Sequence, residues 1–297
     1  MQVGLMAPQG WKGEYNGWDA AAAWQRTVQL AEDAETRGFE SLWAFDHFHT
    51  TPDPTDEITF ESFSVLAALA MATYRVRLGH MVVCAGFRNP ALTAKLASTI
   101  DVISDGRFEL GIGAGWKEEE WLAYGYGFPP LRERMDALGD QLEVITRMFG
   151  PGRATYEGTH AAVAGAVNEP KGIQAHIPVI VGGNGRDRTA GFAVRYADEL
   201  NFVFLRPAEI PERIADVQAK CAAAGRDPGT LRFSMYTKDE AVRPVGQERV
   251  DALGALAETG LDRIVCFPAR WDPTVEGQAS FAEDCRAAGI ALAGTAP

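Results

Sequence analysis

The sequence predicts a single domain over residues 1–297 with the (β/α)₈ fold, also called the TIM barrel. The chain has 297 residues, a length typical of this fold. Short apolar segments alternate with amphipathic helical segments along the whole chain, as they do where helices cover a parallel sheet. There are eight such pairs, and this number favours a closed barrel over an open doubly wound sheet. A Rossmann sheet extended by one pair remains the alternative.

The expected strands are runs that are apolar nearly throughout, which is typical of strands buried on both faces of a parallel sheet. They are Gln2–Ala7, Glu40–Phe45, Val76–Cys84, Phe108–Gly113, Pro178–Val181, Glu199–Phe204, Leu231–Tyr236 and Arg263–Phe267.

The segments between these strands have helical periodicity. In Trp18–Arg37, apolar residues recur three or four positions apart, and the pattern stops at Gly38, a residue common just after a helix. The other expected helices are Phe60–Thr73, Pro90–Ile103, Arg132–Phe149, Arg186–Tyr196, Ala208–Ala224, Gln247–Glu258 and Gln278–Ala288.

Two insertions interrupt the regular alternation. Thr50–Glu57 follows the second strand, and Gly150–His176 precedes the fifth strand. The second insertion is punctuated by glycine and proline, and we expect it to include a short hairpin. Neither insertion has enough apolar residues to form a domain of its own.

Composition excludes several classes of function. A net charge of −12 disfavours binding to the nucleic-acid backbone. No apolar run approaches ~20 residues, so we expect no membrane span. Met1–Gly10 has no basic segment or small-residue cleavage site, and we expect no secretion signal. The cysteines match no metal-binding spacing, which indicates reduced thiols and a cytoplasmic protein; they are Cys84, Cys221, Cys266 and Cys285.

A carboxylate and imidazoles follow the second strand, in Asp46-His47-Phe48-His49. In a barrel, the loops after the strands carry the functional residues. An imidazole here can exchange protons near neutral pH, so His47 is the predicted catalytic residue. His47 and His49 also resemble a metal-binding pair. The remaining histidines complete no ligand set, and we expect no metal.

Two glycine-rich turns follow later strands. Gly182-Gly183-Asn184-Gly185-Arg186 leads directly into a helix, where free amides bind phosphate and glycines let it approach. Gly111–Gly115 imitates the dinucleotide-binding motif, but Trp116 stands where the third glycine would fall. This second turn therefore predicts only a close approach of backbone to ligand. The loop after the first strand, Pro8–Trp18, is rich in glycine and aromatic residues and is expected at the rim.

These segments together resemble the bacterial luciferase-like monooxygenase superfamily over nearly the whole chain. The resemblance depends on the order and spacing of motifs; they are Gly38–Trp43 followed by Asp46-His47-Phe48, Arg88-Asn89-Pro90 with Ala94-Lys95, Thr99–Arg107, Gly111–Trp116 and Ile177–Gly183. Members of that superfamily are (β/α)₈ barrels that use FMN or the deazaflavin coenzyme F420.

The resemblance implies roles for individual residues. Asp46 and His47 match a pair that contacts the deazaflavin ring. Met81-Val82 matches a bulge, often with a non-proline cis peptide, that bends the ring, and Gly182–Gly185 match the turn that receives the cofactor phosphate. The complete predicted cofactor site comprises Asp46, His47, Met81, Val82, Cys84, Gly115, Trp116, Gly182, Gly183, Asn184, Gly185 and Arg186.

One departure from the resemblance concerns the substrate. In sugar-phosphate dehydrogenases of the F420 branch, a glutamate proposed as proton donor follows the third glycine of the strand-4 loop, where this chain has Trp116. Glu118, Glu119 and Glu120 come next, and favourable placement near a helix dipole explains them equally well. We therefore expect a more apolar, aromatic pocket and no sugar-phosphate oxidation.

The resemblance favours an F420-dependent oxidoreductase that transfers a hydride between deazaflavin C5 and a small organic substrate. One alternative is an FMN-dependent monooxygenase supplied with reduced flavin by a separate reductase. Another is a flavin-binding barrel without catalysis. The resemblance further implies a homodimer.

Overall fold

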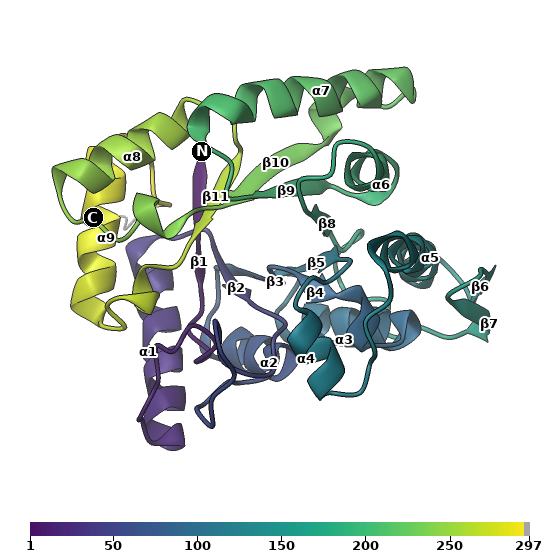
Figure 1. Cartoon of the computed structure of the whole chain (residues 1–297), viewed down its shortest axis with the longest axis horizontal. Helices are drawn as coiled ribbons and strands as arrows, with labels where there is room; N and C mark the ends of the chain where they lie inside the picture. Colours follow the sequence, from purple (N-terminus) through teal and green to yellow (C-terminus); the bar gives the residue numbers. More distant parts are fainter. Residues whose placement is uncertain (294–297) are drawn as a thin grey trace.

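The computed structural model describes residues 1–293, which form a closed barrel of parallel strands surrounded by helices (Figure 1). The predicted domain runs to residue 297, and its last four residues lie outside the described range. The barrel strands are β1 (Gln2–Met6), β2 (Ser41–Ala44), β3 (Arg77–His80), β4 (Val83–Cys84), β5 (Phe108–Gly113), β8 (Val179–Gly182), β9 (Glu199–Val203), β10 (Arg232–Tyr236) and β11 (Arg263–Cys266).

The strand pairing confirms the predicted fold class. β1 lies between β2 and β11, and the order continues through β10, β9 and β8 to β5. β5 also pairs with β3, which in turn pairs with β2, so the ring is closed. This closure excludes the open Rossmann alternative. Since β3 and β4 occupy one position in the ring, the barrel has the eight positions that the sequence predicts.

Helices cover the outside of the barrel, with α1, α8 and α9 on one side and α5 and α6 on the other (Figure 1). No helix in the described residues is long and apolar enough to cross a membrane. Their bounds are α1 (Ala20–Arg37), α2 (Ser62–Ala72), α3 (Pro90–Ile103), α4 (Glu118–Ala123), α5 (Leu131–Phe149), α6 (Arg188–Tyr196), α7 (Ile210–Ala223), α8 (Gln247–Ala257) and α9 (Val275–Ala287).

Local chemistry fixes the ends of α1. Asp19 caps the helix, because its carboxylate accepts hydrogen bonds from two first-turn amides at 3.0 Å. The helix therefore begins two residues later than predicted. Gly38 ends it with a φ of +89°, a conformation that glycine adopts without steric cost.

The third barrel strand differs from the prediction of one continuous run over Val76–Cys84. Met81 and Val82 separate β3 from β4, and both pieces pair with β5. Leu78 lies opposite Phe108, while Val83 lies opposite Ile112. Five residue steps along β3–β4 thus match four along β5, so one extra residue bulges from the ladder.

Both predicted insertions are present. Residues 50–57 contain no helix or strand. The insertion before β8 contains the expected hairpin, formed by β6 (Ala154–Glu157) and β7 (Ala162–Ala166). The hairpin packs on α5 at the edge of the molecule (Figure 1).

A network of charged side chains fills the barrel at the amino ends of the strands. Arg263 is fully buried, and its Nη1 lies 2.8 Å from Oε2 of Glu109. Arg232 lies 3.1 Å from Glu199, which is also fully buried. Burial alone would raise the pKa of Glu109, but the surrounding guanidinium groups outweigh it and hold that pKa at about 2. Burial raises the pKa of Glu199.

Candidate active site

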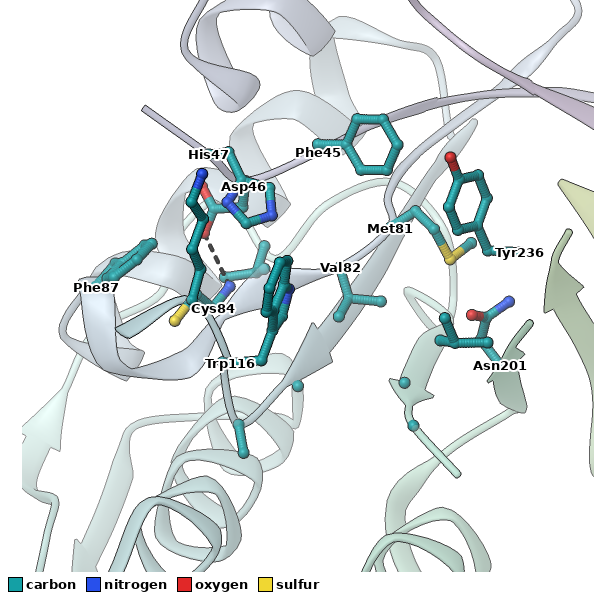
Figure 2. Close-up of a pocket in the computed structure, with 18 of the residues that line it drawn as sticks. Phe45, Asp46, His47, Met81, Val82, Cys84, Phe87, Trp116, Asn201 and Tyr236 are labelled. Carbon is teal, nitrogen blue, oxygen red and sulfur yellow. Dashed lines mark hydrogen bonds between the residues drawn. The ribbon is translucent and has the colours of Figure 1, made fainter. Parts of the chain in front are cut away.

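A cavity of about 520 Å³ opens at the carboxyl ends of the strands, where the connecting loops of a parallel barrel meet. Its wall is mostly apolar and aromatic, with a few polar groups among these side chains. Figure 2 shows His47 and Trp116 on one side of the view and Tyr236 and Asn201 on the other, with Val82 between them.

The cavity brings together nine of the twelve predicted cofactor-binding residues. Asn184, Gly185 and Arg186 are absent from its lining. The nine residues that line it are Asp46, His47, Met81, Val82, Cys84, Gly115, Trp116, Gly182 and Gly183.

His47 forms a close pair with a buried glutamate. Its Nδ1 lies 2.6 Å from Oε2 of Glu120, and the other carboxylate oxygen accepts the Phe48 amide at 2.6 Å. An ionised carboxylate can only accept, so Nδ1 must carry the shared hydrogen. The imidazole is thereby held in one orientation, and Nε2 remains for other partners.

Glu120 is the functional residue that the sequence interpretation did not distinguish. Glu118 and Glu119 are exposed, as acidic residues of a first turn usually are, whereas Glu120 is fully buried. Burial alone would raise its pKa, but the hydrogen bond and charge of His47 outweigh this and lower the pKa. The signal in the sequence was the position of Glu120 beside the buried Trp121, on the inner face of α4.

Two tryptophans also contact the His47 ring. Trp11 stacks on it, with ring centroids 3.9 Å apart and an interplanar angle of 5°. Trp116 approaches edge-on at 5.9 Å and is 65% exposed. The imidazole is therefore fixed by three contacts, and Trp116 forms part of the cavity rim.

Asp46 is buried, and both of its carboxylate oxygens accept hydrogen bonds from other groups of the protein. Its Oδ2 accepts the Cys84 amide at 2.9 Å and Arg88 Nη1 at 2.7 Å, and its Oδ1 accepts the Ser62 hydroxyl. The contact to Cys84 is drawn in Figure 2. These bonds tie the end of β2 to β4. Burial raises the pKa of the Cys84 thiol to about 12, so this cavity residue stays protonated.

The peptide bond between Met81 and Val82 is cis, as the resemblance implies. The Val82 side chain lies against two neighbouring strands. A Cβ on Gly113 or on Gly182 would lie 3.0 Å from a Val82 methyl group. Glycine at both positions therefore leaves room for the Val82 side chain to form a raised shelf in the cavity floor.

The turn after β8 offers amide donors for an anion. Gly183 has a φ of +136° and lines the cavity together with Thr189 in the first turn of α6. The amides of Arg188 and Thr189 have no acceptor in the described part of the chain. Free amides at a helix start are suited to phosphate.

The side chains of Asn184, Arg186 and Arg188 bind other parts of the protein and do not line the cavity. Asn184 binds the backbone of Val203 through both its amide nitrogen and its oxygen. Arg186 lies 3.0 Å from Glu212 on α7, and both are exposed. Arg188 pairs with Asp136 at 2.5 Å. Both arginines near this turn are thus engaged with other groups.

These features fit a planar cofactor that carries a phosphate. The donors of the β8–α6 turn would hold the phosphate, the Val82 shelf would support the ring, and His47 would face the reacting side. Within residues 1–293, no group of three or more His, Cys, Asp or Glu side chains is arranged to hold a metal ion.

Fold and cavity define a (β/α)₈ barrel whose ligand site lies at the carboxyl ends of its strands. The chain belongs to the luciferase-like monooxygenase family, whose model matches residues 1–238. Members of this family are oxidoreductases and monooxygenases. The chain is 30% identical over 255 residues to the pyrimidine monooxygenase RutA of Stutzerimonas stutzeri, covering 81% of this chain and 69% of that protein.

Solved structures share the barrel over nearly its whole length. An F420-dependent secondary alcohol dehydrogenase, in complex with an F420–acetone adduct, superposes with a TM-score of 0.81 at 21% identity, covering 97% of this chain and 98% of that chain. A type II Baeyer–Villiger monooxygenase from a Pseudomonas putida plasmid, in complex with FMN, gives 0.72 at 16% identity, covering 98% and 99%. At these identities the likeness shows the fold.

Proposed function

We propose that this protein is an oxidoreductase that uses F420 and transfers a hydride between deazaflavin C5 and a small organic substrate. The observation that carries the proposal is the His47–Glu120 pair on the cavity wall. Reduction of a carbonyl needs a proton on oxygen in addition to the hydride. The alcohol dehydrogenase that shares this fold is F420-dependent, which supports the same cofactor here.

Different residues of the chain would have different roles in this reaction. Bound reduced F420 would supply the hydride; its chemistry belongs to the cofactor. His47 would give a proton to the substrate oxygen from Nε2, or take it back in the oxidative direction. Glu120 keeps the imidazole in orientation through Nδ1. The apolar wall would keep water away from the reacting atoms once the ligands are bound.

A titration of the purified chain with F420 and with FMN tests the cofactor assignment. We expect F420 fluorescence or absorbance to change with a saturable dependence on protein, and FMN to bind more weakly. Tight binding of reduced FMN without binding of F420 would contradict the proposal.

The second candidate is an FMN-dependent monooxygenase supplied by a separate reductase. It is favoured by the 30% identity with a pyrimidine monooxygenase. Oxygen consumption that requires both reduced FMN and substrate would identify it.

A third possibility is a barrel that binds a flavin without catalysing a reaction. Turnover by the purified chain would exclude this possibility, and His47→Ala in such an active preparation then tests the role of His47. Loss of turnover with cofactor affinity retained would assign His47 to the chemistry, while unchanged turnover would remove it from any catalytic role.

We also propose that two copies form a homodimer, as the family resemblance implies. Light scattering should give twice the chain mass of 32.2 kDa. All four cysteines are buried and unpaired, which supports the reducing, cytoplasmic location that we propose.

A further inference from the structure

Lys12 places an ammonium group at the cavity on the loop that follows β1. It lines the cavity beside Trp11, and its Nζ lies 4.2 Å from the centre of the indole ring. The same indole stacks on His47. A cation over an aromatic face is stabilised by the ring. The Trp11 indole therefore contacts both Lys12 and the proposed proton donor, His47.

The acidic groups around Lys12 are already engaged. Glu14 accepts the amides of Gln9, Gly10 and Lys12 itself. Asp239 forms an ion pair with Arg270. In the described residues, no acceptor lies within hydrogen-bond distance of Lys12 Nζ, and its donors remain available to a ligand in the cavity.

This cation lies far from the proposed phosphate turn. Lys12 follows β1 and Thr189 follows β8, and these strands occupy opposite positions in the eight-position ring. Lys12 and Thr189 nevertheless line the same cavity. An anion at Lys12 is therefore a different group from a phosphate at Gly183 and Thr189, and it would belong to the substrate.

We propose that Lys12 determines substrate specificity by binding a carboxylate or other oxyanion on an otherwise apolar, aromatic molecule. The inference rests on the proposed function, because it assigns the substrate to the same cavity. The tryptophan and phenylalanine side chains of the wall accept the apolar body. Hydrogen bonds between an ammonium and an oxyanion are stronger than those between neutral groups, so the anion would discriminate strongly against neutral analogues.

The protonation of Lys12 supports this role. Burial lowers its pKa to about 8, with the charge of Arg270 acting in the same direction. The side chain therefore remains mostly protonated at neutral pH, yet its charge lacks full hydration. A bound anion would supply the missing interactions.

A pair of dyes of nearly the same shape tests the proposal without any cofactor. 8-Anilino-1-naphthalenesulfonate carries an anion on an aromatic body, and N-phenyl-1-naphthylamine is the same molecule without the sulfonate. Fluorescence titrations would compare the wild type with Lys12→Met and Lys12→Arg. Lys220→Met is the matched control, because Lys220 pairs with Asp216 on the outer helix α7.

We expect the wild type to bind the sulfonate dye roughly tenfold more tightly than the neutral dye. Lys12→Met should abolish this preference while leaving the neutral dye unchanged, and Lys12→Arg should retain it. Equal binding of the two dyes by the wild type, a preference that survives Lys12→Met, or failure of both dyes to bind would each overturn the proposal. Since no cofactor is present, these outcomes are independent of whether F420 or FMN binds.

Discussion

At the scale of single residues, His47 could be predicted and its partner could not. His47 directly follows an apolar strand, and a barrel places such a residue at the mouth. Glu120 lies 73 residues away, within a run of three glutamates. The helix dipole explains all three equally well, and only the packing of α4 shows which one is buried.

Glu120→Gln tests this pair. The amide keeps the size of the side chain but removes the charge beside His47, so we expect kcat to fall by roughly 10- to 100-fold, as when a residue that orients a metal-bound imidazole is replaced. Cofactor affinity should stay unchanged, because the amide preserves the shape of the cavity wall. Steady-state kinetics and a cofactor titration would measure both effects.

Glu119→Gln is the control for that experiment. Glu119 lies on the same helix and is exposed, so Glu119→Gln should leave both kcat and cofactor affinity unchanged. A Glu120→Gln enzyme that loses kcat and cofactor affinity together would indicate a purely structural role for Glu120.

Lys12 gives a second prediction at this scale, in the dependence of anion binding on pH. The folded-state pKa of about 8 lies below the ordinary value of 10.5, so the ammonium is present below pH 8 and is lost as the pH rises through this value. Arg270 and Lys117 favour that loss, while Asp239 and Glu14 oppose it. Affinity for the sulfonate dye should therefore fall between pH 7 and 9.5 toward that of the neutral dye.

Lys12→Arg provides the comparison, since a guanidinium stays charged throughout this range. Titrations at fixed ionic strength would show a flat profile for this variant. An equally steep decline in the arginine variant would mean that another group controls the binding.

At the scale of elements, the barrel strands and the long helices were predictable, whereas the short helix α4 and the break between β3 and β4 were not. α3 occupies the predicted residues Pro90–Ile103, because Asn89 caps it and Pro90 suits its first turn. α4 was not predicted; it has six residues, too few for a periodic pattern. The break between β3 and β4 depends on one bulged residue, and from the residues alone that segment has the same composition as a continuous strand.

The charged network at the amino ends of the strands should contribute strongly to stability through Arg263. Arg263→Met would leave Glu109 and Glu199 buried beside each other with one positive charge fewer to stabilise them. Removing one partner of a buried ion pair costs roughly 3–5 kcal/mol. Urea denaturation should show a loss of this size in the free energy of unfolding.

Lys220→Met, which breaks a partly exposed pair one turn apart on α7, should cost at most about 1 kcal/mol. Adding Glu199→Gln to Arg263→Met should recover part of the loss, because one of the two buried carboxyl groups is then removed. A loss below about 1 kcal/mol in Arg263→Met would show that water or neighbouring arginines compensate for the missing charge.

At the scale of the whole molecule, the alternation of strands and helices predicts the barrel, but it does not predict which side chains meet. Lys12, His47 and Glu120 follow three different strands and come together at one cavity only in the folded barrel. Their approach depends on the register of β1, β2 and β5 and on how each loop packs. Neither is encoded in a local pattern, so sequence spacing identifies candidates and the closed barrel selects among them.

The molecule as a whole is strongly acidic, although an anion is proposed to bind at its mouth. The net charge is −12, while Lys12, Lys117 and Arg270 are cations near the cavity. At long range an anionic ligand should be repelled, and only at contact should it be attracted. Salt shortens the Debye length from about 30 Å at 0.01 M to about 8 Å at 0.15 M, which removes the long-range repulsion first.

We therefore expect the association rate of the sulfonate dye to rise severalfold over this range of salt, while that of the neutral dye stays constant. Stopped-flow fluorescence with both dyes would measure the two rates under identical conditions, and the neutral dye corrects for any effect of salt on the protein itself. A rate that falls with salt for the sulfonate dye alone would contradict the prediction. It would mean that the cations at the mouth dominate the field that an approaching ligand encounters, and that the acidic surface elsewhere is too distant to oppose them.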